Sequence, residues 1–354
     1  MINLGIIGLG KWSNVLTKAS QKSSEIKIIS AYSRSKETRD KYTSQYNIPS
    51  VSSVDDLLRN QDVKGIILTV PNELHFEYAK LCGEYGKHIY IEKPITNNLS
   101  EAFELKTICD KLGVKVFVGH VAKLLTGIQI MHKEILNGKL GDICLIEGNF
   151  SNERALSLTP ENWRWHQLKA PGGSLSQIAI HQLDVFRFLG GEISDVSALS
   201  SKKSPVGAEV EDQWVINILF KNGSLGSLVS SWTSPGIFEV RVIGTKGLMH
   251  YKMDQTKWGD PELIHENASL IFQKIGSSFN EAVKYDLKPE NMYRTELELF
   301  VQMIKGVNQE FFDARYGIEI LSLVEACRAS AQNKSIRINL NSFLSKIREK
   351  NDIT

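Results

Sequence analysis

The sequence lacks the features that mark secreted, disulfide-stapled or membrane-spanning chains. Only 4 of its 354 residues are cysteine, and they are scattered without a CxxC pair, which indicates thiols of a reducing compartment. No run of about 18 apolar residues is present that could span a membrane. The N-terminus also lacks the basic region of a signal peptide. We therefore expect a cytoplasmic protein with no membrane partner.

An excess of charge of either sign is also missing. The 42 basic and 40 acidic residues leave a formal net charge of +2, which gives no reason to expect nucleic acid as a partner. The 8 histidines show no HExxH or paired spacing, so we expect no metal site. The chain has no internal repeat, and its length predicts roughly two domains at about 150 residues each.

Short apolar runs alternate with longer amphipathic ones over the first 120 residues. This alternation predicts βαβ units around a parallel sheet, with helices on both of its faces. The expected strands are Ile2–Gly8, Ile26–Tyr32, Gly65–Val70, His88–Ile91 and Val114–Val118. The expected helices are Ser13–Ser20, Lys36–Tyr46, Val54–Leu58, Glu73–Tyr85 and Ser100–Leu112.

After residue 120 the pattern changes to sequential strands separated by tight turns, which indicates an antiparallel sheet. The expected strands are Asp142–Phe150, Ile193–Ser200, Asp212–Phe220, Ser224–Thr233, Phe238–Gly244 and Gly247–Lys252. The expected helices are Leu124–Asn137, Leu175–Leu189, Tyr293–Lys305 and Gly317–Gln332. The predicted fold class is α/β. A doubly wound Rossmann domain over 1–120 precedes an α+β domain over 121–354 with an open, mostly antiparallel sheet, and the last helices could pack back on the first domain.

A glycine-rich turn follows the first expected strand and opens a helix. Its residues are Gly8-Leu9-Gly10-Lys11-Trp12-Ser13. The first glycine permits a tight turn, and the second lets the backbone approach a pyrophosphate at the helix N-terminus. Ser13 replaces a third glycine and is small enough for close packing. The turn therefore predicts a dinucleotide cofactor, with an ordinary glycine turn as the alternative.

The end of the second expected strand bears on which dinucleotide binds. NAD-binding proteins usually carry an acidic residue there, which accepts hydrogen bonds from the ribose. This chain instead has Ser33 and Arg34, followed by Lys36 and Arg39. A hydroxyl and a guanidinium group would bind a 2′-phosphate, so the sequence favours NADP over NAD. Stacking of Arg34 on the adenine, which suits either cofactor, is the alternative.

Further short motifs follow along the chain. They are Thr69-Val70-Pro71-Asn72-Glu73-Leu74-His75, Glu92-Lys93-Pro94, Trp163-Arg164, Gly172-Gly173 and His181-Gln182-Leu183-Asp184. In this order, and together with the glycine turn, they make the sequence similar to the Gfo/Idh/MocA family of oxidoreductases over nearly its whole length. The resemblance implies a Rossmann domain and a C-terminal domain whose open sheet often mediates oligomerisation. We therefore expect a homodimer or homotetramer.

The resemblance also implies roles for single residues. Lys93 matches the family's lysine that contacts substrate and nicotinamide, and His181 matches its catalytic histidine. Gln177 stands where the family commonly has aspartate, and its amide can only orient substrate by hydrogen bonding. Asp184 would either orient the imidazole of His181 or cap local structure, and His181 itself could instead be a core residue. The remaining residues implied at the cofactor are Thr69, Pro71, Asn72, His75 and Glu92.

Aromatic and basic residues lie shortly before the Gly172-Gly173 pair. The face of Trp163 suits a sugar ring, and Arg164 or Lys169 could bind a carboxylate or phosphate on that sugar. Packing of these side chains beneath the sheet is the alternative. Lys123, in the segment that opens the next expected helix, is a further candidate for substrate contact.

These residues predict an NAD(P)-dependent dehydrogenase or reductase that acts on a secondary hydroxyl or keto carbon of a sugar, cyclitol or sugar derivative. Lys93 would stabilise negative charge on the substrate oxygen, and either Lys93 or His181 would transfer the proton. One alternative is a redox-neutral, glycosidase-like enzyme that retains NAD. The other is a non-enzymatic regulator that senses the dinucleotide, against which the presence of Lys93 and His181 argues.

Overall fold

The computed structural model describes residues 1–350, which form two compact units. The first unit comprises Met1–His120 together with Asn291–Glu319. The second comprises Val121–Glu290 and the residues from Ile320 onward. No helix within the described residues is long and apolar enough to cross a membrane.

The first unit contains a five-stranded sheet in the order β2-β1-β3-β4-β5, and every neighbouring pair is parallel. The strands are β1 (Ile2–Ile7), β2 (Ile26–Tyr32), β3 (Gly65–Leu68), β4 (His88–Glu92) and β5 (Val116–Gly119). All residues of β3 and β5 are buried, as expected for strands that are covered on both faces. The order reverses between β1 and β3, which makes the carboxyl ends of these two strands the switch point of the sheet.

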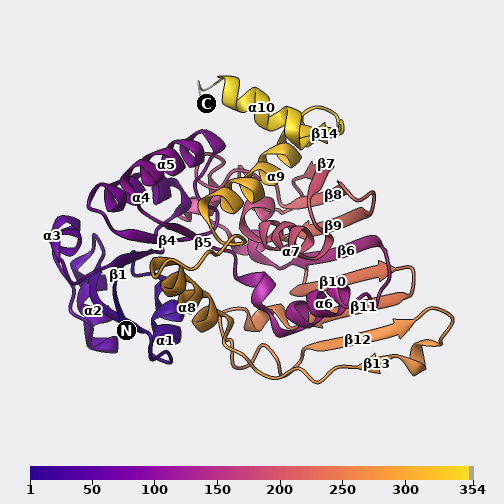
Figure 1. The fold of residues 1–354 in the computed structure, drawn as a ribbon. Helices are drawn as coiled ribbons and strands as arrows, with labels where there is room; N and C mark the ends of the chain where they lie inside the picture. Colours follow the sequence, from indigo (N-terminus) through magenta and orange to yellow (C-terminus); the bar gives the residue numbers. More distant parts are fainter. Residues whose placement is uncertain (351–354) are drawn as a thin grey trace. The chain divides into compact units, whose positions relative to one another are not determined.

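Helices connect the parallel strands (Figure 1). They are α1 (Lys11–Ser20), α2 (Lys36–Tyr46), α3 (Val54–Arg59), α4 (His75–Glu84) and α5 (Leu99–Leu112). Ser35, Ser53 and Asn98 precede α2, α3 and α5, and their side-chain oxygens accept a backbone N–H of the first turn. These caps explain why the three helices begin where they do.

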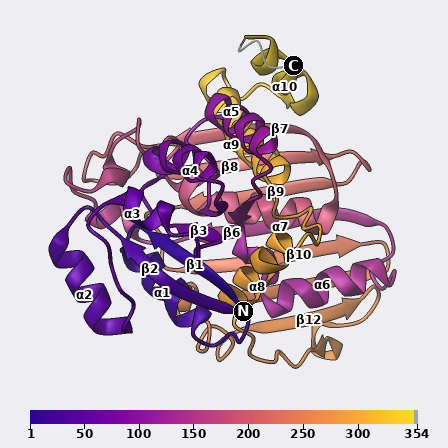
Figure 2. The ribbon, with the colours of Figure 1, turned by 60° about the vertical axis from the view of Figure 1, so that its left-hand side comes forward.

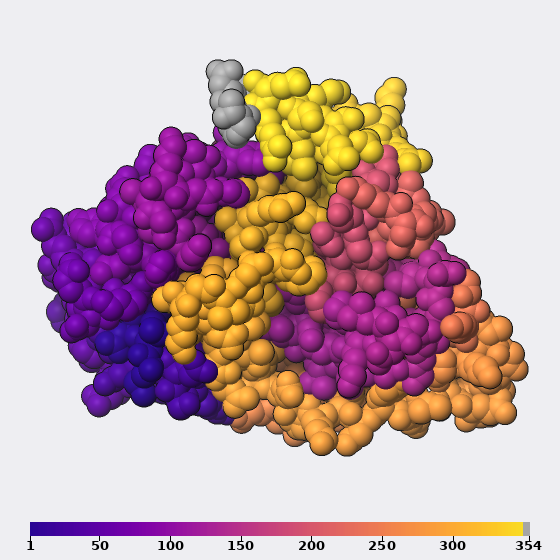
Figure 3. Space-filling model, in the orientation of Figure 1, coloured from indigo at the N-terminus to yellow at the C-terminus, as the bar shows by residue number. Residues whose placement is uncertain are grey.

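A late segment of the chain returns to complete the first unit. It contains α8 (Met292–Ile304), which packs against α1, and the start of α9 (Ala314–Gln332). The Val118 amide donates to the Phe312 carbonyl oxygen at 2.7 Å, and the rings of Phe117 and Phe312 stack at 4.7 Å. Figure 3 shows this segment, in amber, against the indigo residues of the same unit.

The second unit contains a nine-stranded sheet in the order β13-β12-β11-β10-β6-β9-β8-β7-β14, in which only β6 and β9 pair in parallel. The central strands are β6 (Ile143–Ser151), β7 (Ile193–Ser201), β8 (Gln213–Phe220), β9 (Leu225–Ser231), β10 (Ile237–Gly244) and β11 (Gly247–Met253). β12 (Ser269–Lys274) lies next to β11, and the two edge strands are β13 (Val283–Lys284) and β14 (Ile338–Asn339). Figure 2 shows the larger strands side by side.

Helices α6 (Thr126–Leu136) and α7 (Ile180–Gly190) pack on this sheet, α6 on β11 and α7 on β6. The approach of α6 is close, since a Cβ atom at Gly127 would lie 2.2 Å from the Tyr251 ring. Along β8, Trp214, Ile216 and Ile218 are buried, whereas Val215 between them is 44% exposed. This alternation means that one face of the sheet carries the core and the other is open.

The predicted fold class is confirmed, with a parallel doubly wound sheet followed by a mostly antiparallel one. Two helical predictions differ in detail. Glu73–Tyr85 begins as a 3-10 turn over Asn72–Leu74, and Leu175–Leu189 begins as a π-helix over Leu175–Ala179. The strands β12, β13 and β14 and the helix α10 (Leu340–Lys350) were not predicted.

Candidate active site

The turn between β1 and α1 lies at the switch point of the parallel sheet. Gly8 has a φ of +92°, and a Cβ atom there would lie 2.8 Å from the backbone carbon of Thr69. Only glycine fits this close approach of two strand ends. Thr69, which directly follows β3, donates its hydroxyl hydrogen to the Gly8 carbonyl oxygen and so ties the two ends together.

Gly10 precedes α1, and the first turn of this helix has neither a side-chain cap nor an acidic residue. A Cβ atom at Gly10 would meet no atom of the described residues within 4 Å. The uncapped N–H groups therefore border an open cradle, which fits a pyrophosphate. Ser13 is buried and its hydroxyl donates to the Gly10 carbonyl oxygen at 2.7 Å.

The side chains that follow Gly8 in this turn are less buried than those of β1. Leu9 and Trp12 are half-buried and Lys11 is exposed. The Lys11 ammonium lies 5.9 Å from the Trp12 ring centroid, and the Trp12 ring lies 6.0 Å from that of Tyr293 on α8. Trp12 therefore packs against α8 and lies beside the open cradle.

The loop after β2 carries the residues predicted to select the cofactor. Ser33 is half-buried and Arg34 is exposed. Arg39 donates from Nη1 to the carbonyl oxygens of Ser33 and Arg34, at 2.6 and 3.0 Å, and Lys36 pairs with Asp40 at 2.6 Å. Arg39 and Lys36 therefore shape and flank the loop, whereas the side chain of Arg34 is exposed.

The loop after β3 carries two buried polar side chains. Asn72 is buried, and its Nδ2 has no hydrogen-bond partner among the described residues, as expected of a donor reserved for a ligand. His75 is buried between the carbonyl oxygens of Pro94 and Val70, at 2.7 and 3.0 Å. Burial lowers the pKa of His75 to about 4, so it is neutral and donates to one carbonyl at a time. His75 thereby positions the turn that contains Lys93, while Pro71 lies half-buried beside Asn72.

The carboxyl end of β4 leads into Glu92, Lys93 and Pro94, and the Lys93–Pro94 peptide bond is cis. Lys93 is half-buried and follows directly from the central part of the sheet. Burial raises the pKa of Glu92 to about 7, although the positive charge of Lys93 opposes this change. Protonation of Glu92 near neutral pH thus changes the charge beside Lys93.

A buried polar chain behind this turn was not predicted from the sequence. The Tyr90 hydroxyl donates to Glu296 Oε2 at 2.7 Å and lies 3.3 Å from Glu92 Oε1. Glu296 belongs to α8 and is fully buried, and a Cβ atom at Gly119 would lie 2.5 Å from the Tyr90 hydroxyl. One feature of the sequence could have indicated Glu296: its carboxylate lies within the apolar stripe of an amphipathic helix.

In the second unit, Lys123 and Asp184 form a buried ion pair with 2.8 Å between Nζ and Oδ1. Their side chains are 1% and 0% exposed, so water stabilises neither charge and the removal of one partner would leave the other charge buried. The structure thus joins two of the predicted substrate residues directly. Asp184 lies one helical turn after His181 on α7, and its pairing with Lys123 fixes that turn.

His181 is buried beside two aromatic rings, with ring centroids 5.0 Å from Trp258 and 5.8 Å from Phe150. One turn earlier, Gln177 Oε1 accepts a hydrogen bond from Arg164 Nε at 3.1 Å. Gln177 belongs to the π-helix that precedes α7, a distortion that often marks functional sites. Trp258 was not predicted, because its contact with His181 joins distant parts of the chain.

The segment Trp163–Trp165 forms a 3-10 turn, in which the Arg164 guanidinium lies 4.2 Å from the Trp163 ring centroid. Burial lowers the pKa of Arg164 to about 9, and the nearby charge of Arg154 contributes. Lys169 is half-buried in the loop that follows. Sequence reasoning missed Arg154, which lies ten residues away from Arg164 in an irregular segment.

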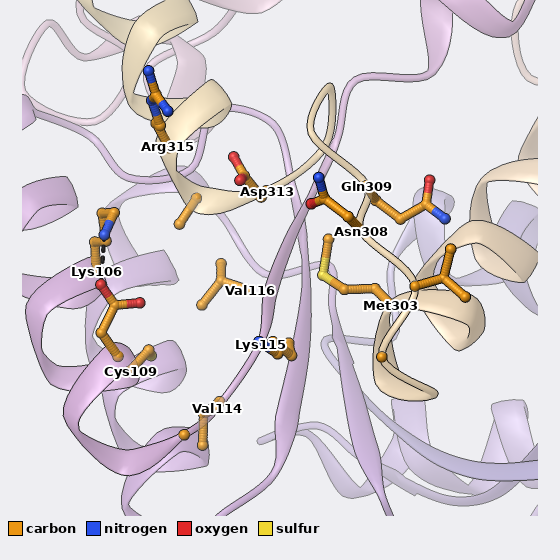
Figure 4. Close-up of a pocket in the computed structure, with 15 residues that line it drawn as sticks. Lys106, Cys109, Val114, Lys115, Val116, Met303, Asn308, Gln309, Asp313 and Arg315 are labelled. Atoms are coloured by element: carbon orange, nitrogen blue, oxygen red, sulfur yellow. Dashed lines mark hydrogen bonds and ion pairs between the residues drawn. The ribbon is translucent and has the colours of Figure 1, made fainter.

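A separate cavity of about 420 Å³ lies within the first unit (Figure 4). It is lined by Lys106, Lys115, Asp313 and Arg315, among others, near the amino end of β5. None of the predicted site residues lines it. The parallel sheet therefore places this cavity at the edge opposite the switch point, and it takes no part in the site. No group of three or more metal-binding side chains occurs among the residues described.

Comparison with known proteins identifies the family. Residues 2–120 match the model of an oxidoreductase family with an NAD-binding Rossmann fold, and residues 128–250 match the GFO/IDH/MocA C-terminal domain. The fold superposes with a TM-score of 0.91 on a proposed NADPH-dependent oxidoreductase from Desulfitobacterium hafniense DCB-2. That protein is 31% identical, and the match covers 96% of this chain and 98% of the other.

Two relatives named for a specific activity are more distant in sequence. The 1,5-anhydro-D-fructose reductase of Ensifer adhaerens is 26% identical over 317 residues, which cover 88% of this chain and 91% of the relative. The 2,7-anhydro-N-acetylneuraminate hydratase of Escherichia coli K12 is 26% identical over 265 residues, or 72% and 69% of the two chains. The expected class of NAD(P)-dependent oxidoreductase is thereby confirmed, and the chain belongs to the GFO/IDH/MocA oxidoreductase family.

Proposed function

We propose that this enzyme transfers a hydride between a nicotinamide dinucleotide and a secondary hydroxyl or keto carbon of a sugar, cyclitol or sugar derivative. The observation that carries the proposal is the uncapped cradle at Gly10, which lies at the edge of the parallel sheet where Lys93 directly follows β4. A reductase of an anhydro sugar is among the relatives, which supports the substrate class. We assign cofactor binding to residues 1–120 and substrate binding to the domain that follows.

Some residues of the chain would bind the cofactor, and others would bind or transfer the substrate proton. The N–H groups that open α1 would hold the pyrophosphate, and Asn72 would donate its unpartnered Nδ2 hydrogens to the bound nucleotide. When bound, the nicotinamide ring supplies or accepts the hydride. Lys93 would stabilise negative charge on the substrate oxygen, and Lys93 or His181 would hold the proton that leaves or joins it.

A second candidate function is a redox-neutral reaction in which the cofactor is retained. The observation that favours it is the relative named a hydratase, an activity with no net oxidation. The two functions differ in whether free NAD(P)H changes during turnover. A panel of sugars, cyclitols and nucleotide sugars, followed by NAD(P)H absorbance and by product analysis, separates them.

Replacing Lys93 by alanine is expected to lower turnover at least about a hundredfold, the usual scale for a positioned acid–base or electrostatic group. Cofactor affinity and melting temperature should change little, because Lys93 follows the strand and lies outside the core. The measurement is steady-state kinetics on the best sugar of the panel. Lys115→Ala, which removes an exposed lysine near the other edge of the sheet, is the matched control. Wild-type turnover in Lys93→Ala would show that the assignment is wrong.

Replacing His181 by alanine tests whether this histidine is catalytic or a core residue. A catalytic role predicts a loss of turnover comparable to that of Lys93→Ala, while the cofactor still binds. Its packing against Trp258 predicts some loss of thermal stability as well. Activity is therefore measured well below the melting temperature of the variant. A variant that only melts earlier, with wild-type turnover, would support the core reading.

Cofactor choice follows from the loop after β2. Ser33 and Arg34 lie where an acidic residue would repel a 2′-phosphate, so we propose that NADPH binds at least as tightly as NADH. Ser33→Asp should shift the ratio of the two dissociation constants toward NADH at least tenfold, about 1.4 kcal/mol. Calorimetric titration of both cofactors measures this ratio, with Ser24→Asp at an exposed position as the control. A wild type that prefers NADH tenfold would contradict the proposal.

The open face of the second sheet supports a homodimer or homotetramer. Leu199 pairs with Val215 across β7 and β8, and Val215 pairs with Val229 across β8 and β9. These side chains, which are 62%, 44% and 38% exposed, form one apolar row, and Leu225 nearby is 54% exposed. We propose that a second copy of the chain covers this row.

Light scattering at micromolar concentration is expected to give a mass of at least twice 39.8 kDa. Introducing glutamate at Val215 and Val229 should reduce this mass toward the monomer, because the charges would be buried against the second copy. Leu112→Glu, at an exposed leucine of the first unit, is the control. A monomeric wild type would overturn the proposal.

A further inference from the structure

Two arginines of the second unit form no ion pair with an acidic side chain of the described residues. Arg154 opens the 3-10 turn Arg154–Ser157 after β6, and Arg164 lies in the turn Trp163–Trp165. The two turns attach to the same part of the sheet: the Glu209 amide donates to the Trp165 carbonyl oxygen at 3.1 Å, and Trp232, which accepts from the Ala155 amide, donates to the Asp212 carbonyl oxygen at 2.8 Å. Burial lowers the pKa of both arginines, and the charge of Arg154 also lowers the pKa of Arg164. Within residues 1–350, neither forms an ion pair with a carboxylate, and the acid that acts on Arg154 is the exposed Glu153.

The backbone and the surrounding rings hold Arg154 in place. Its amide donates to Asn152 Oδ1 at 3.1 Å, and the next amide, of Ala155, donates to the Trp232 carbonyl oxygen at 2.8 Å. The guanidinium carbon lies 5.9 Å from the centroid of the fully buried Trp232 ring. The Nε atom of Arg154 is itself buried and has no hydrogen-bond partner in the described part of the chain. A buried donor of this kind costs stability unless something accepts its hydrogen.

Arg164 is held from two sides by neutral groups. Its Nε donates to Gln177 Oε1 at 3.1 Å, and its guanidinium carbon lies 4.2 Å from the Trp163 ring centroid. The glutamine amide fixes the direction of the guanidinium group without cancelling its charge. The two Nη atoms carry the remaining four of the five N–H donors, in the fork geometry that matches carboxylate and phosphate oxygens.

From this arrangement we propose that Arg154 and Arg164 form an anion subsite beside Gln177, and that the sugar substrate carries a carboxylate or phosphate group. Two like charges held close together in a partly buried site repel each other, and an anionic ligand relieves both the repulsion and the unsatisfied donor. The inference rests on the proposed function and names the substrate class of the same site. Aromatic packing alone, without a ligand, is the competing account of the two arginines.

Binding measurements distinguish an anion subsite from aromatic packing alone, and they do not depend on turnover. The protein is loaded with NADPH and titrated calorimetrically with glucose 6-phosphate, glucuronate, glucose, inorganic phosphate and acetate. We expect at least one anionic sugar to bind ten times more tightly than glucose, and the phosphate and carboxylate arms identify the preferred group. A wild type that binds none of the four anions more tightly than glucose would overturn the proposal.

Variants assign the preference to the two arginines. Arg154→Gln and Arg164→Gln should each reduce the ratio of anionic to neutral affinity at least about tenfold, the scale of a charge-assisted hydrogen bond. Arg154→Lys keeps the charge but not the forked guanidinium geometry, and should retain part of the ratio of anionic to neutral affinity. Arg59→Gln, which removes an exposed charge, is the control. Circular dichroism confirms that each variant is folded. Unchanged ratios in both glutamine variants would leave aromatic packing as the role of these arginines.

The same titrations distinguish this proposal from the proposed hydride transfer. For this purpose each sugar that binds is also incubated with the enzyme and NADP+ or NAD+, the oxidants that a secondary hydroxyl requires. An anionic sugar that binds through the arginines and yields no NAD(P)H under these conditions would support the subsite and contradict the redox function. Hydride transfer to sugars of equal affinity, charged or neutral, would support the function and contradict the subsite.

Discussion

The close approach of two strand ends at Gly8 is the constraint on which the first unit depends. Because β1 and β3 are neighbours at the switch point, the chain leaving β1 must turn within van der Waals contact of Thr69. A residue with a side chain would separate these ends and displace α1. The uncapped N–H groups of α1 would then no longer lie at the edge of the sheet where Lys93 follows β4.

Most of the parallel unit could be predicted from the sequence because its elements are locally encoded. Continuous apolar runs give buried strands, and polar caps such as Ser35 start the helices, so α2 was predicted with its observed bounds. The strands β12 and β13 were missed because, apart from the buried Leu270, their residues are half-exposed or exposed and follow no clear alternation. β12 pairs with β11 and β13 pairs with β12, and sequence periodicity does not reveal these neighbours.

The candidate site divides in the same way. Glycine turns and the Glu92-Lys93-Pro94 motif are contiguous in sequence, and so were found. Glu296, Trp258 and Arg154 reach their partners only through tertiary contacts. Trp258 and Arg154 stand outside the long helices and strands and carry no periodic signal, and the position of Glu296 in α8 does not reveal its partner. The pairing of Lys123 with Asp184 also joins two residues that the sequence could only propose separately.

The hydrogen bond between Tyr90 and Glu296 joins residues that lie 206 positions apart in the chain. The nucleotide-binding unit is therefore discontinuous, and the whole second-unit segment up to Glu290 is synthesised before α8 arrives to cover Tyr90 and Phe117. A ribosome-bound chain that ends near residue 120 exposes this aromatic surface and leaves the Tyr90 hydroxyl without its carboxylate partner. Completion of the NAD-binding Rossmann unit is thus coupled to synthesis of residues 121–290 of the second unit, so a chain that folds this unit in full already carries most of the other.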